Sequence, residues 1–429
     1  MARRSSATDR QRAEGRRAAQ GEGTAETEPP VPLRRNVPFQ LLWSGAAAST
    51  LGMQVSDTAF PLLLLAMTGS STLAGAFGAA QLGASVLFGV HAGAVADRCD
   101  RRRILIVADS VRLVAALSVP IAMALGRLTV VQTLLVAVVI GASVAYGGPV
   151  RLLAVRSVVP PSQLRQALAR DEARMSGAGL AGPPLAGLLL GAGRGVPFLG
   201  AALASGLSLT AACLVRLPRP AGAADSPAGP RGGALAGFRH LLADRTLRAT
   251  LLVVFGINLA GSAMVLPVMV LLREQGTPSG GIGLALAGEA VGAMAGSLLV
   301  GRLHRLAGPG RLLLAVAWSA VPLFVAPLLP GGAVTVFAAL LLMGLGVPAL
   351  RVMIDILLFQ QVAEELRGRV VAATMTLFTV GVPAGLLGSG VLLDHVAPDT
   401  ALTVLAALLA LWLLPVTFDR TLRGAAWPA

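Results

Sequence analysis

The sequence contains no lysine and only one tyrosine and two cysteines, and its charged residues are few. Asp, Glu, Lys and Arg together make up 13% of the 429 residues, whereas soluble domains carry roughly 25%. By length alone the chain could form two or three soluble domains. Because it has too little charge to coat water-soluble globules, the composition excludes that class.

The few cysteines and histidines give no sign of a disulfide framework or a metal centre. Cys99 lies beside arginines and Cys213 lies in an apolar stretch, with no ligand spacing between them. The histidines are far apart in the sequence. We therefore expect no bound metal and no cofactor. The four histidines are His91, His240, His304 and His395.

The net charge of +14 comes entirely from arginine. A nucleic-acid-binding surface would pair such charge with aromatic side chains on which bases stack, but aromatic residues make up only 4% of the chain. The arginines also lie in the N-terminal stretch and in short polar segments rather than along one helix face. This placement favours the positive-inside rule of membrane proteins, and we expect no nucleic-acid partner.

Hydrophobic residues reach 55% of the sequence, and the mean hydropathy is +0.75. They are arranged in blocks of roughly 20 residues, the length that crosses a hydrocarbon core about 30 Å thick. The pattern predicts an all-α integral membrane protein with twelve transmembrane helices. The predicted spans are 39–67, 73–96, 103–124, 129–150, 169–191, 197–216, 249–272, 280–301, 311–329, 333–358, 370–393 and 399–417.

One long polar stretch divides these spans into two groups of six. Residues 217–248 are rich in proline, glycine and alanine, which is typical of a linker. We therefore predict a disordered cytoplasmic tail at 1–35, an N-terminal six-helix bundle at 36–216, a cytoplasmic linker at 217–248, a C-terminal six-helix bundle at 249–417 and a cytoplasmic tail at 418–429. The polar residues 1–35 lack the apolar core of a secretory signal.

The arginines predict the orientation of the spans. Loops on one side hold most of them, whereas the opposite loops hold only Arg127, Arg194 and Arg273. The positive-inside rule then places both chain termini in the cytoplasm. A faint repeat also relates the halves, since Pro149 and Arg151 near the end of span four recur as Pro348 and Arg351 near the end of span ten. Parallel repeats are a known transporter plan, with the substrate site between the halves.

The most specific motif lies between spans two and three and reads GAVADRCDRRRIL from Gly93. It joins a glycine, a carboxylate and several arginines at the predicted cytoplasmic surface. Asp97 can engage a helix N-terminus or a neighbouring arginine and so act as a latch between moving halves. A simple topogenic loop would need only the arginines. The gate motif comprises Gly93, Asp97, Arg98, Arg101 and Arg102.

This motif resembles the loop signature of the major facilitator superfamily, although Asp100 stands where glycine is commonest. Further segments are similar to the branch that holds macrolide-efflux and enterobactin-exporter-like drug:proton antiporters. These segments are Asp109-Ser-Val-Arg112 in span three, Gly182-Pro183-Pro184-Leu-Ala-Gly187 in span five, and Gln360-Gln361-Val362 with Arg367-Gly368-Arg369-Val370 after span ten.

The resemblance implies a monomeric two-bundle transporter of the bacterial inner membrane that rocks around a central cavity and uses the proton gradient. Gly182, Pro183 and Gly187 match the antiporter motif of span five, which favours export. Many drug exporters of the superfamily carry an arginine within span four, but here the first arginine of that span is Arg151, near its cytoplasmic end. The coupling scheme of those relatives therefore does not transfer directly.

A charge inside the bilayer is costly and normally faces a cavity or a partner. Asp109 and Arg112 lie three residues apart on one helix face and can form a pair. Arg351 and Asp355 form a second candidate pair near the cytoplasmic end of span ten. A structural ion pair is an alternative to a functional role for both. Asp171, Glu172 and Arg174 are interpreted as a solvated or interbundle charge cluster.

Asp57 in span one and Glu289 in span eight have no evident partner on their own helices. A carboxylate in an alternating cavity can take up a proton from one side and release it to the other, as proton coupling requires, or attract a cationic substrate. A hydrogen bond to a neighbouring helix is the structural alternative. Gln54 and Gln81 are further candidates for the cavity wall.

The leading hypothesis is proton-coupled efflux of small amphipathic molecules such as antibiotics, drugs or siderophores, because polar groups in the spans are sparse. Proton-coupled uptake is the alternative within transport. A polytopic membrane enzyme is disfavoured because paired carboxylates in a long extramembrane loop are lacking. We therefore expect a non-enzymatic transporter with a small-molecule substrate, protons and the lipid bilayer as its partners.

Overall fold

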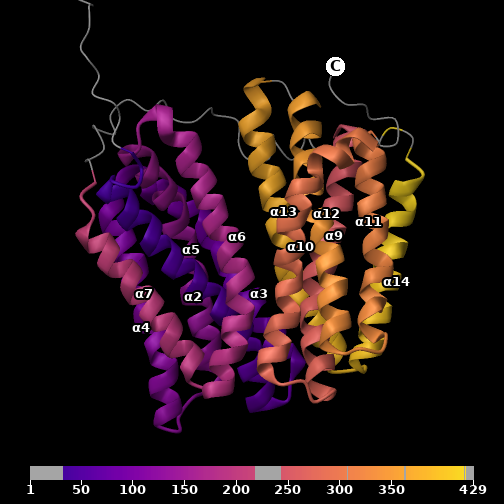
Figure 1. Cartoon of the computed structure of the whole chain (residues 1–429), viewed down its shortest axis with the longest axis horizontal. Coiled ribbons are helices and arrows are strands. Elements are labelled where there is room, and N and C mark those ends of the chain that lie inside the picture. Colours follow the sequence, from indigo (N-terminus) through magenta and orange to yellow (C-terminus); the bar gives the residue numbers. More distant parts are fainter. Residues whose placement is uncertain (1–31, 218–242, 307, 362–363, 420, 422–429) are drawn as a thin grey trace, which may run out of the picture.

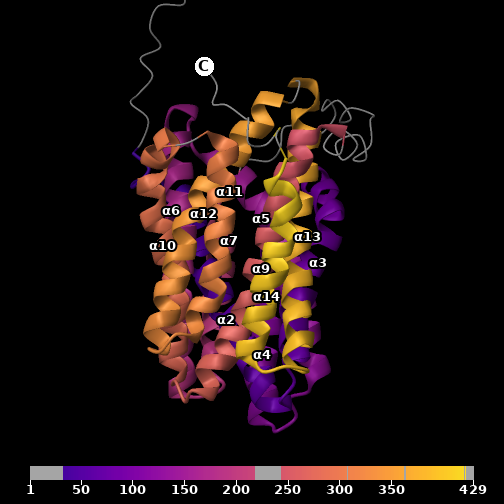
Figure 2. The ribbon, with the colours of Figure 1, turned by 90° about the vertical axis from the view of Figure 1, so that its right-hand side faces the viewer.

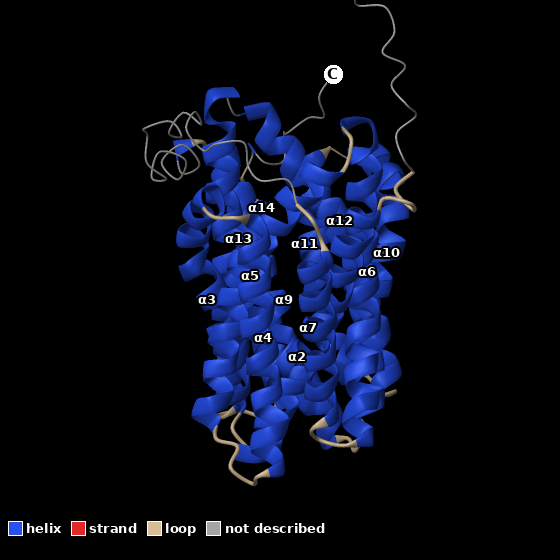
Figure 3. Ribbon diagram, turned by 90° about the vertical axis from the view of Figure 1, so that its left-hand side faces the viewer, coloured by secondary structure: helices blue, strands red, loops and turns tan. Residues whose placement is uncertain are grey.

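A computed structural model describes residues 32–217, 243–306, 308–361, 364–419 and 421. Within these ranges the chain consists of helices and short connections, with no β-strand (Figure 3). Most of the predicted N-terminal tail, linker and C-terminal tail lies outside the described residues. The prediction of an all-α fold is therefore confirmed for the part of the chain that the structure describes.

The described chain contains twelve long α-helices and one short 3₁₀ turn. The first six are α2 (Val37–Thr68), α3 (Ser71–Arg98), α4 (Arg101–Ala124), α5 (Val130–Val158), α6 (Pro161–Ala192) and α7 (Val196–Leu214). The second six are α9 (Arg245–Glu274), α10 (Ser279–Leu306), α11 (Pro309–Val325) followed by η1 (Ala326–Leu328), α12 (Ala333–Gln361), α13 (Glu364–Leu393) and α14 (Pro398–Thr417).

Eleven of these helices are long and apolar enough to cross a membrane, and α13 has a shorter apolar stretch at Val380–Leu393 among its described residues. Each predicted span coincides with one helix. Several helices exceed the prediction: α5 runs to Val158 rather than 150, α6 begins at Pro161 rather than 169, α10 runs to Leu306 rather than 301, and α13 begins at Glu364 rather than 370. The extra turns carry arginines, so a reading of hydropathy alone ends at the last apolar residue although the helix continues.

Polar side chains mark several helix starts, because the first backbone N–H groups of a helix lack partners within it. Asn36 accepts a hydrogen bond from the N–H of Phe39 at 3.1 Å before α2. Asp100 does the same for Arg102 at 2.8 Å before α4. Asp100, which departs from the commonest superfamily pattern, is therefore the N-cap of α4.

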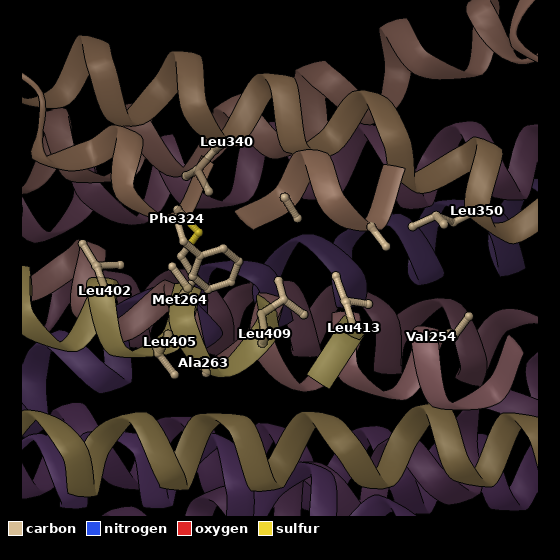
Figure 4. Packing of buried hydrophobic residues seen from close by; sticks show 14 of the residues in the cluster. Val254, Ala263, Met264, Phe324, Leu340, Leu350, Leu402, Leu405, Leu409 and Leu413 are labelled. Atoms are coloured by element: carbon tan, nitrogen blue, oxygen red, sulfur yellow. The ribbon is translucent and has the colours of Figure 1, made fainter. Parts of the chain in front are cut away.

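The first six helices pack as one bundle and the last six as a second, side by side in Figure 1, whereas Figure 2 views the molecule from the side of the second bundle. In the second bundle, α9 packs against α13 and α14, and α10 packs along α12. Its interior is apolar, with Met264 of α9 and Phe324 of α11 fully enclosed beside Leu340 of α12 and Leu405 of α14 (Figure 4).

The two bundles meet through α6 against α10 and through α3 against α13. Small residues allow this close approach, as is usual between membrane helices. A Cβ atom at Gly187 of α6 would overlap the carbonyl oxygen of Ser279, the first residue of α10. A Cβ atom at Gly75 of α3 would overlap the carbonyl oxygen of Leu386 of α13. These positions lie in the half of the helices remote from Pro32 and Asp419, where the continuously described chain begins and ends; that end of the molecule is called the end of the chain termini below.

Toward the chain termini the bundles separate. The α6–α10 contact extends to Gly179 and Ala290, where an added Cβ atom would still be 4.0 Å from the alanine. One turn further, Met175 continues the same face of α6 and Met294 the same face of α10. Their exposed fractions are 48% and 50%. The space between the bundles is therefore closed at the remote end and open toward the termini.

Candidate functional site

A cluster of five charged residues lines a cavity of about 340 Å³ among α2, α4, α5 and α6, here called the N-bundle cavity. Ser49 and Thr50 of α2 and Ser143 of α5 contribute hydroxyl groups to its wall. Leu168 and Met175 of α6 line it as well and are exposed. The cavity therefore combines a polar interior with an apolar border on the face of α6 where the bundles separate. Its charged residues are Asp109, Arg112, Arg151, Asp171 and Arg174.

Two guanidinium groups share the carboxylate of Asp109. Arg112 lies one turn along α4, and its Nη2 contacts Oδ1 of Asp109. Nη2 of Arg151, from α5, lies 3.2 Å from Oδ1 and 3.3 Å from Oδ2. The hydroxyl of Ser208 on α7 donates to Oδ2 at 2.7 Å. The carboxylate is only 1% exposed, so this network joins three helices inside the bundle.

Asp171 and Arg174 on α6 form a second ion pair, in which one carboxylate compensates one guanidinium. Nη2 and Nε of Arg174 donate to Oδ1 of Asp171 at 2.7 and 2.9 Å, and Nη1 donates to the carbonyl oxygen of Ala46 at 3.0 Å and also contacts Thr50. The Arg174 side chain is only 8% exposed. The interpretation of this segment as a solvated or interbundle charge cluster fits Asp171, which is 39% exposed. It does not fit Arg174, because this buried guanidinium crosses from α6 to the backbone of α2 in the same bundle.

Asp57 lines a second cavity of about 200 Å³ at the boundary between the bundles, here called the seam cavity. Its carboxylate is exposed to that cavity, and Nε2 of Gln81 on α3 donates to Oδ1 at 2.9 Å. The partner of Asp57 is thus on the next helix, where sequence spacing cannot reveal it. The other amide atom of Gln81, Oε1, is buried and has no hydrogen-bond partner.

Glu289 of α10 lines a third cavity of about 380 Å³ inside the second bundle, here called the C-bundle cavity. Within the described part of the chain its carboxylate has no hydrogen-bond or ion-pair partner. Asn258, Ser262 and Ser319 add polar groups to the wall, but each donates to a backbone carbonyl. Glu289 therefore lines this cavity without a hydrogen-bond or ion-pair partner among the described residues.

The seam cavity and the C-bundle cavity are neighbours. Val265 of α9 and Leu386 of α13 line both of them. Asp57 and Glu289 therefore line two neighbouring cavities, the first at the boundary between the bundles and the second inside the second bundle, that share two apolar wall residues. The sequence indicated both carboxylates separately, but their placement in adjoining cavities follows from the packing of α9 and α13.

The antiporter-like motif lies where α6 meets α2 and α10. A Cβ atom at Gly182 would overlap Cβ of Gln54 on α2, and the carbonyl oxygen of Pro183 lies against Gly283 of α10. With Gly187 against Ser279, the motif forms the α6 side of the α6–α10 contact between the bundles. Gln54 thus lies at the junction of α2 and α6.

Parts of two predicted sites fall outside the description. The side chains of Asp97, Arg98 and Asp355 are not described, so neither the latch nor the Arg351–Asp355 pair can be placed, although Arg351 itself is exposed. Arg102 donates to the carbonyl oxygen of Ala212 at 3.4 Å and contacts that of Cys213, which ties the start of α4 to the end of α7. An added Cβ atom at Gly93 would meet open space.

Sequence reasoning used Arg151 only as a marker of the end of span four and did not single out Ser208. A pairing between Arg151 and Asp109 joins residues 42 positions apart on different helices. One signal in the sequence could have indicated a partner on another helix: Arg151 lies within a predicted span and has no acidic residue three or four positions away. Among the described residues, no group of three or more His, Cys, Asp or Glu side chains could hold a metal ion.

Comparisons with known proteins agree with this architecture. The sequence profile of the transmembrane secretion effector family matches residues 27–423. The multidrug efflux pump Tap of Mycobacterium tuberculosis is 28% identical over 374 residues, across 84% of this chain and 88% of that protein. The protein of the same name from Mycobacterium bovis matches with the same identity and coverage.

Solved transporter structures share the fold. A crystal structure of the nucleoside transporter NupG matches with a TM-score of 0.71 and 12% identity, over 89% of this chain and 98% of that chain. A bacterial homolog of the human lysosomal transporter Spinster, inward-facing and occupied, matches with a TM-score of 0.72 and 14% identity, over 93% and 100% of the two chains. The chain belongs to the transmembrane secretion effector family, within the major facilitator superfamily of membrane transporters.

Proposed function

We propose that this transporter is a proton-coupled exporter of small amphipathic molecules, such as antibiotics, drugs or siderophores. The carrying observation is the pair of adjoining cavities, the seam cavity at the bundle boundary and the C-bundle cavity inside the second bundle, each lined by one exposed acidic residue, Asp57 in the first and Glu289 in the second. The efflux function in the name of the Tap relatives favours the same direction of transport.

The geometry is suited to coupling because the two cavities share wall residues on helices that would move relative to the first bundle. Val265 and Leu386 belong to α9 and α13, and α13 packs directly on α3 of the other bundle. A rocking motion that separates α3 from α13 would change the access of both cavities to water. A carboxylate there can bind a proton in one state and release it in the other. Glu289 is our first choice because it has no fixed partner in the described part of the chain.

The remaining features of the proposal follow from charge and fold. The excess of arginines at the end that carries the chain termini supports a cytoplasmic location for both termini. The transporter then lies in the bacterial inner membrane as a monomer, and the present state opens toward the cytoplasm. Export requires the opposite, outward-open state to be reached by rupture of the α6–α10 and α3–α13 contacts.

The test is drug protection in an efflux-deficient bacterial host. Wild type, Glu289→Gln and the control Glu274→Gln are expressed at equal membrane levels and challenged with chemically diverse antibiotics, dyes and siderophores. Glu274 is a suitable control because it is exposed at the end of α9. We expect wild type and Glu274→Gln to protect, and Glu289→Gln to lose protection and pH-driven accumulation in inverted vesicles.

The possible outcomes separate the parts of the proposal. Equal protection by Glu289→Gln retains export but removes Glu289 from coupling, and Asp57→Asn then tests the second carboxylate. Accumulation of substrates inside intact cells rather than protection would replace export by uptake. Chemical conversion of a substrate by the purified protein would instead indicate an enzyme.

A further inference from the structure

The N-bundle cavity contains more positive than negative charge. Its wall carries the carboxylates of Asp109 and Asp171 and the guanidinium groups of Arg112, Arg151 and Arg174. Arg174 and Asp171 pair one to one. Arg112 and Arg151 share the single carboxylate of Asp109. One guanidinium charge in the cavity is therefore not compensated by the described residues that line it.

The donors of this cluster are also incompletely used. Asp109 already accepts from Arg112, Arg151 and Ser208, so its oxygens are fully engaged. Arg112 is only 9% exposed, and its buried Nε has no hydrogen-bond partner among the described residues. A buried donor on a charged group without an acceptor is costly. An anion in the cavity would satisfy both the excess charge and donors of this kind.

The border of the cavity defines the rest of the ligand. Leu152 of α5 is 40% exposed, and Leu168 and Met175 of α6 are 37% and 48% exposed. Met175 lies on the α6 face at which the bundles separate. A molecule that enters between the bundles therefore passes the apolar side chains of Leu168 and Met175, with the partly exposed carboxylate of Asp171 between them, before it reaches the arginines.

We infer that the N-bundle cavity is a subsite for the anionic group of an amphipathic substrate, with Arg112 and Arg151 as its ligands and the apolar border as the seat of the attached hydrocarbon. The inference rests on the proposed export function for its biological meaning and specifies the substrate class as organic acids. A guanidinium fork suits carboxylate, sulfonate and phosphate groups equally. An inorganic anion would satisfy the same charge, and the experiment separates the two sources.

The experiment measures the unfolding temperature of the purified protein in detergent at increasing concentrations of two probes that share the same aromatic rings. The probe 8-anilinonaphthalene-1-sulfonate carries an anionic group, and N-phenyl-1-naphthylamine lacks it. A ligand that binds only the folded protein raises the unfolding temperature with its concentration, which yields an apparent Kd. Wild type is compared with Arg112→Gln, with Arg112→Lys and with the control Arg127→Gln, whose arginine is exposed at the remote end of the bundle.

We expect the sulfonate to stabilise wild type and Arg127→Gln alike. Loss of a charge-assisted hydrogen bond should weaken its binding to Arg112→Gln by roughly 10-fold or more, with partial recovery in Arg112→Lys. Binding of the neutral probe should be the same in all four proteins. If Arg112→Gln fails to fold, Arg151→Gln removes the same excess charge and replaces it in the comparison.

Two results would overturn the inference. The first is sulfonate binding that is unchanged by either arginine substitution. The second is full stabilisation by chloride alone that also displaces the sulfonate, which would make the cluster an inorganic anion site. Because the assay uses no membrane gradient, its outcome does not depend on proton coupling. If the protein fails to export drugs, the binding assay can still support the anion subsite. If the protein does export drugs, the same assay can still refute the subsite.

Discussion

The carboxylate of Asp394, just after α13, accepts a hydrogen bond at 2.7 Å from the backbone N–H of Ser71, the first residue of α3. The same carboxylate accepts from the N–H of Thr72 at 3.2 Å and from the hydroxyl of Ser70 at 3.0 Å. A residue of the second bundle thus caps a helix of the first. This contact holds the bundles together at the end remote from the chain termini.

Substitution Asp394→Ala should weaken closure at this end. Loss of a helix cap costs about 1 kcal/mol, or roughly 5-fold in an equilibrium, so the population open at the remote end should rise by that factor. Spin labels at Arg127→Cys and Gln275→Cys, in a background with Cys99 and Cys213 replaced by serine, report the distance between the bundles there.

The matched control is Asp399→Ala at the same end. Asp399 is exposed and bonds only to its neighbour Thr400 through its side chain, so its removal should leave the distance distribution as in wild type. Equal distributions for Asp394→Ala and wild type would mean that the cap contributes nothing to closure.

The pH dependence of the same contact follows from its hydrogen bonds. Partial burial acts to raise the pKa of Asp394, but the hydrogen bonds from Thr72, Ser71 and Ser70 together outweigh it, so the pKa lies below the ordinary value of 3.8. A carboxylate of this kind contributes its full stabilisation above the ordinary pKa and loses it as pH falls through the lowered value.

The label distance should therefore stay constant from pH 8 to pH 5 and lengthen only below pH 3.8. The transition should be absent in Asp394→Ala. The pH-dependent transition should persist in Glu274→Gln. Glu274 is a suitable control because it lines the same surface pocket as Asp394. A change in distance near neutral pH, in the presence of Asp394, would assign the pH response to another group.

The close approach of α6 and α10 makes a steric prediction. Gly187→Val adds a side chain where Cβ alone would overlap the carbonyl oxygen of Ser279. Overpacking of this kind costs about 1–3 kcal/mol, so the variant should populate the remotely open state and lose transport. Gly191→Val, on the same helix with nothing within 4 Å of the added Cβ, is the control. Normal drug protection by Gly187→Val would show that the backbones can separate without loss of the cycle.

The helices were predictable from the sequence because hydropathy and length act locally. Each of the twelve spans coincides with a helix, and the errors at α5 and α6 arise where helical turns carry arginine beyond the apolar core. The membrane class also follows directly from composition, since 13% charge cannot solvate a chain of this length.

The partners of the buried charges were predictable only within one helix. The spacing of Asp109 and Arg112 places them one turn apart, but the contacts of Arg151 with Asp109 and of Gln81 with Asp57 depend on how α5 packs against α4 and α3 against α2. Rotation of one helix by a few tens of degrees would break either contact without any change in hydropathy. A single sequence does not specify that rotation.

The shared carboxylate of Asp109 makes an asymmetric stability prediction. Asp109→Asn leaves two buried guanidinium groups without their anion and should cost about 3–5 kcal/mol, because removal of one member of a buried ion pair exposes the full desolvation penalty of the other. Arg112→Gln instead leaves Arg151 and Asp109 as a one-to-one pair and should keep the unfolding temperature at or above that of wild type.

The double variant Asp109→Asn with Arg112→Gln should recover part of the loss, since it returns the cluster to one uncompensated guanidinium as in the wild type. Thermal unfolding of the purified proteins measures the ranking, and Asp109→Asn with Arg127→Gln is the matched double variant that should show no recovery. If Arg112→Gln is as unstable as Asp109→Asn, the folded protein needs both arginines beside Asp109 for its stability. The cavity then carries no excess charge that is available to a ligand.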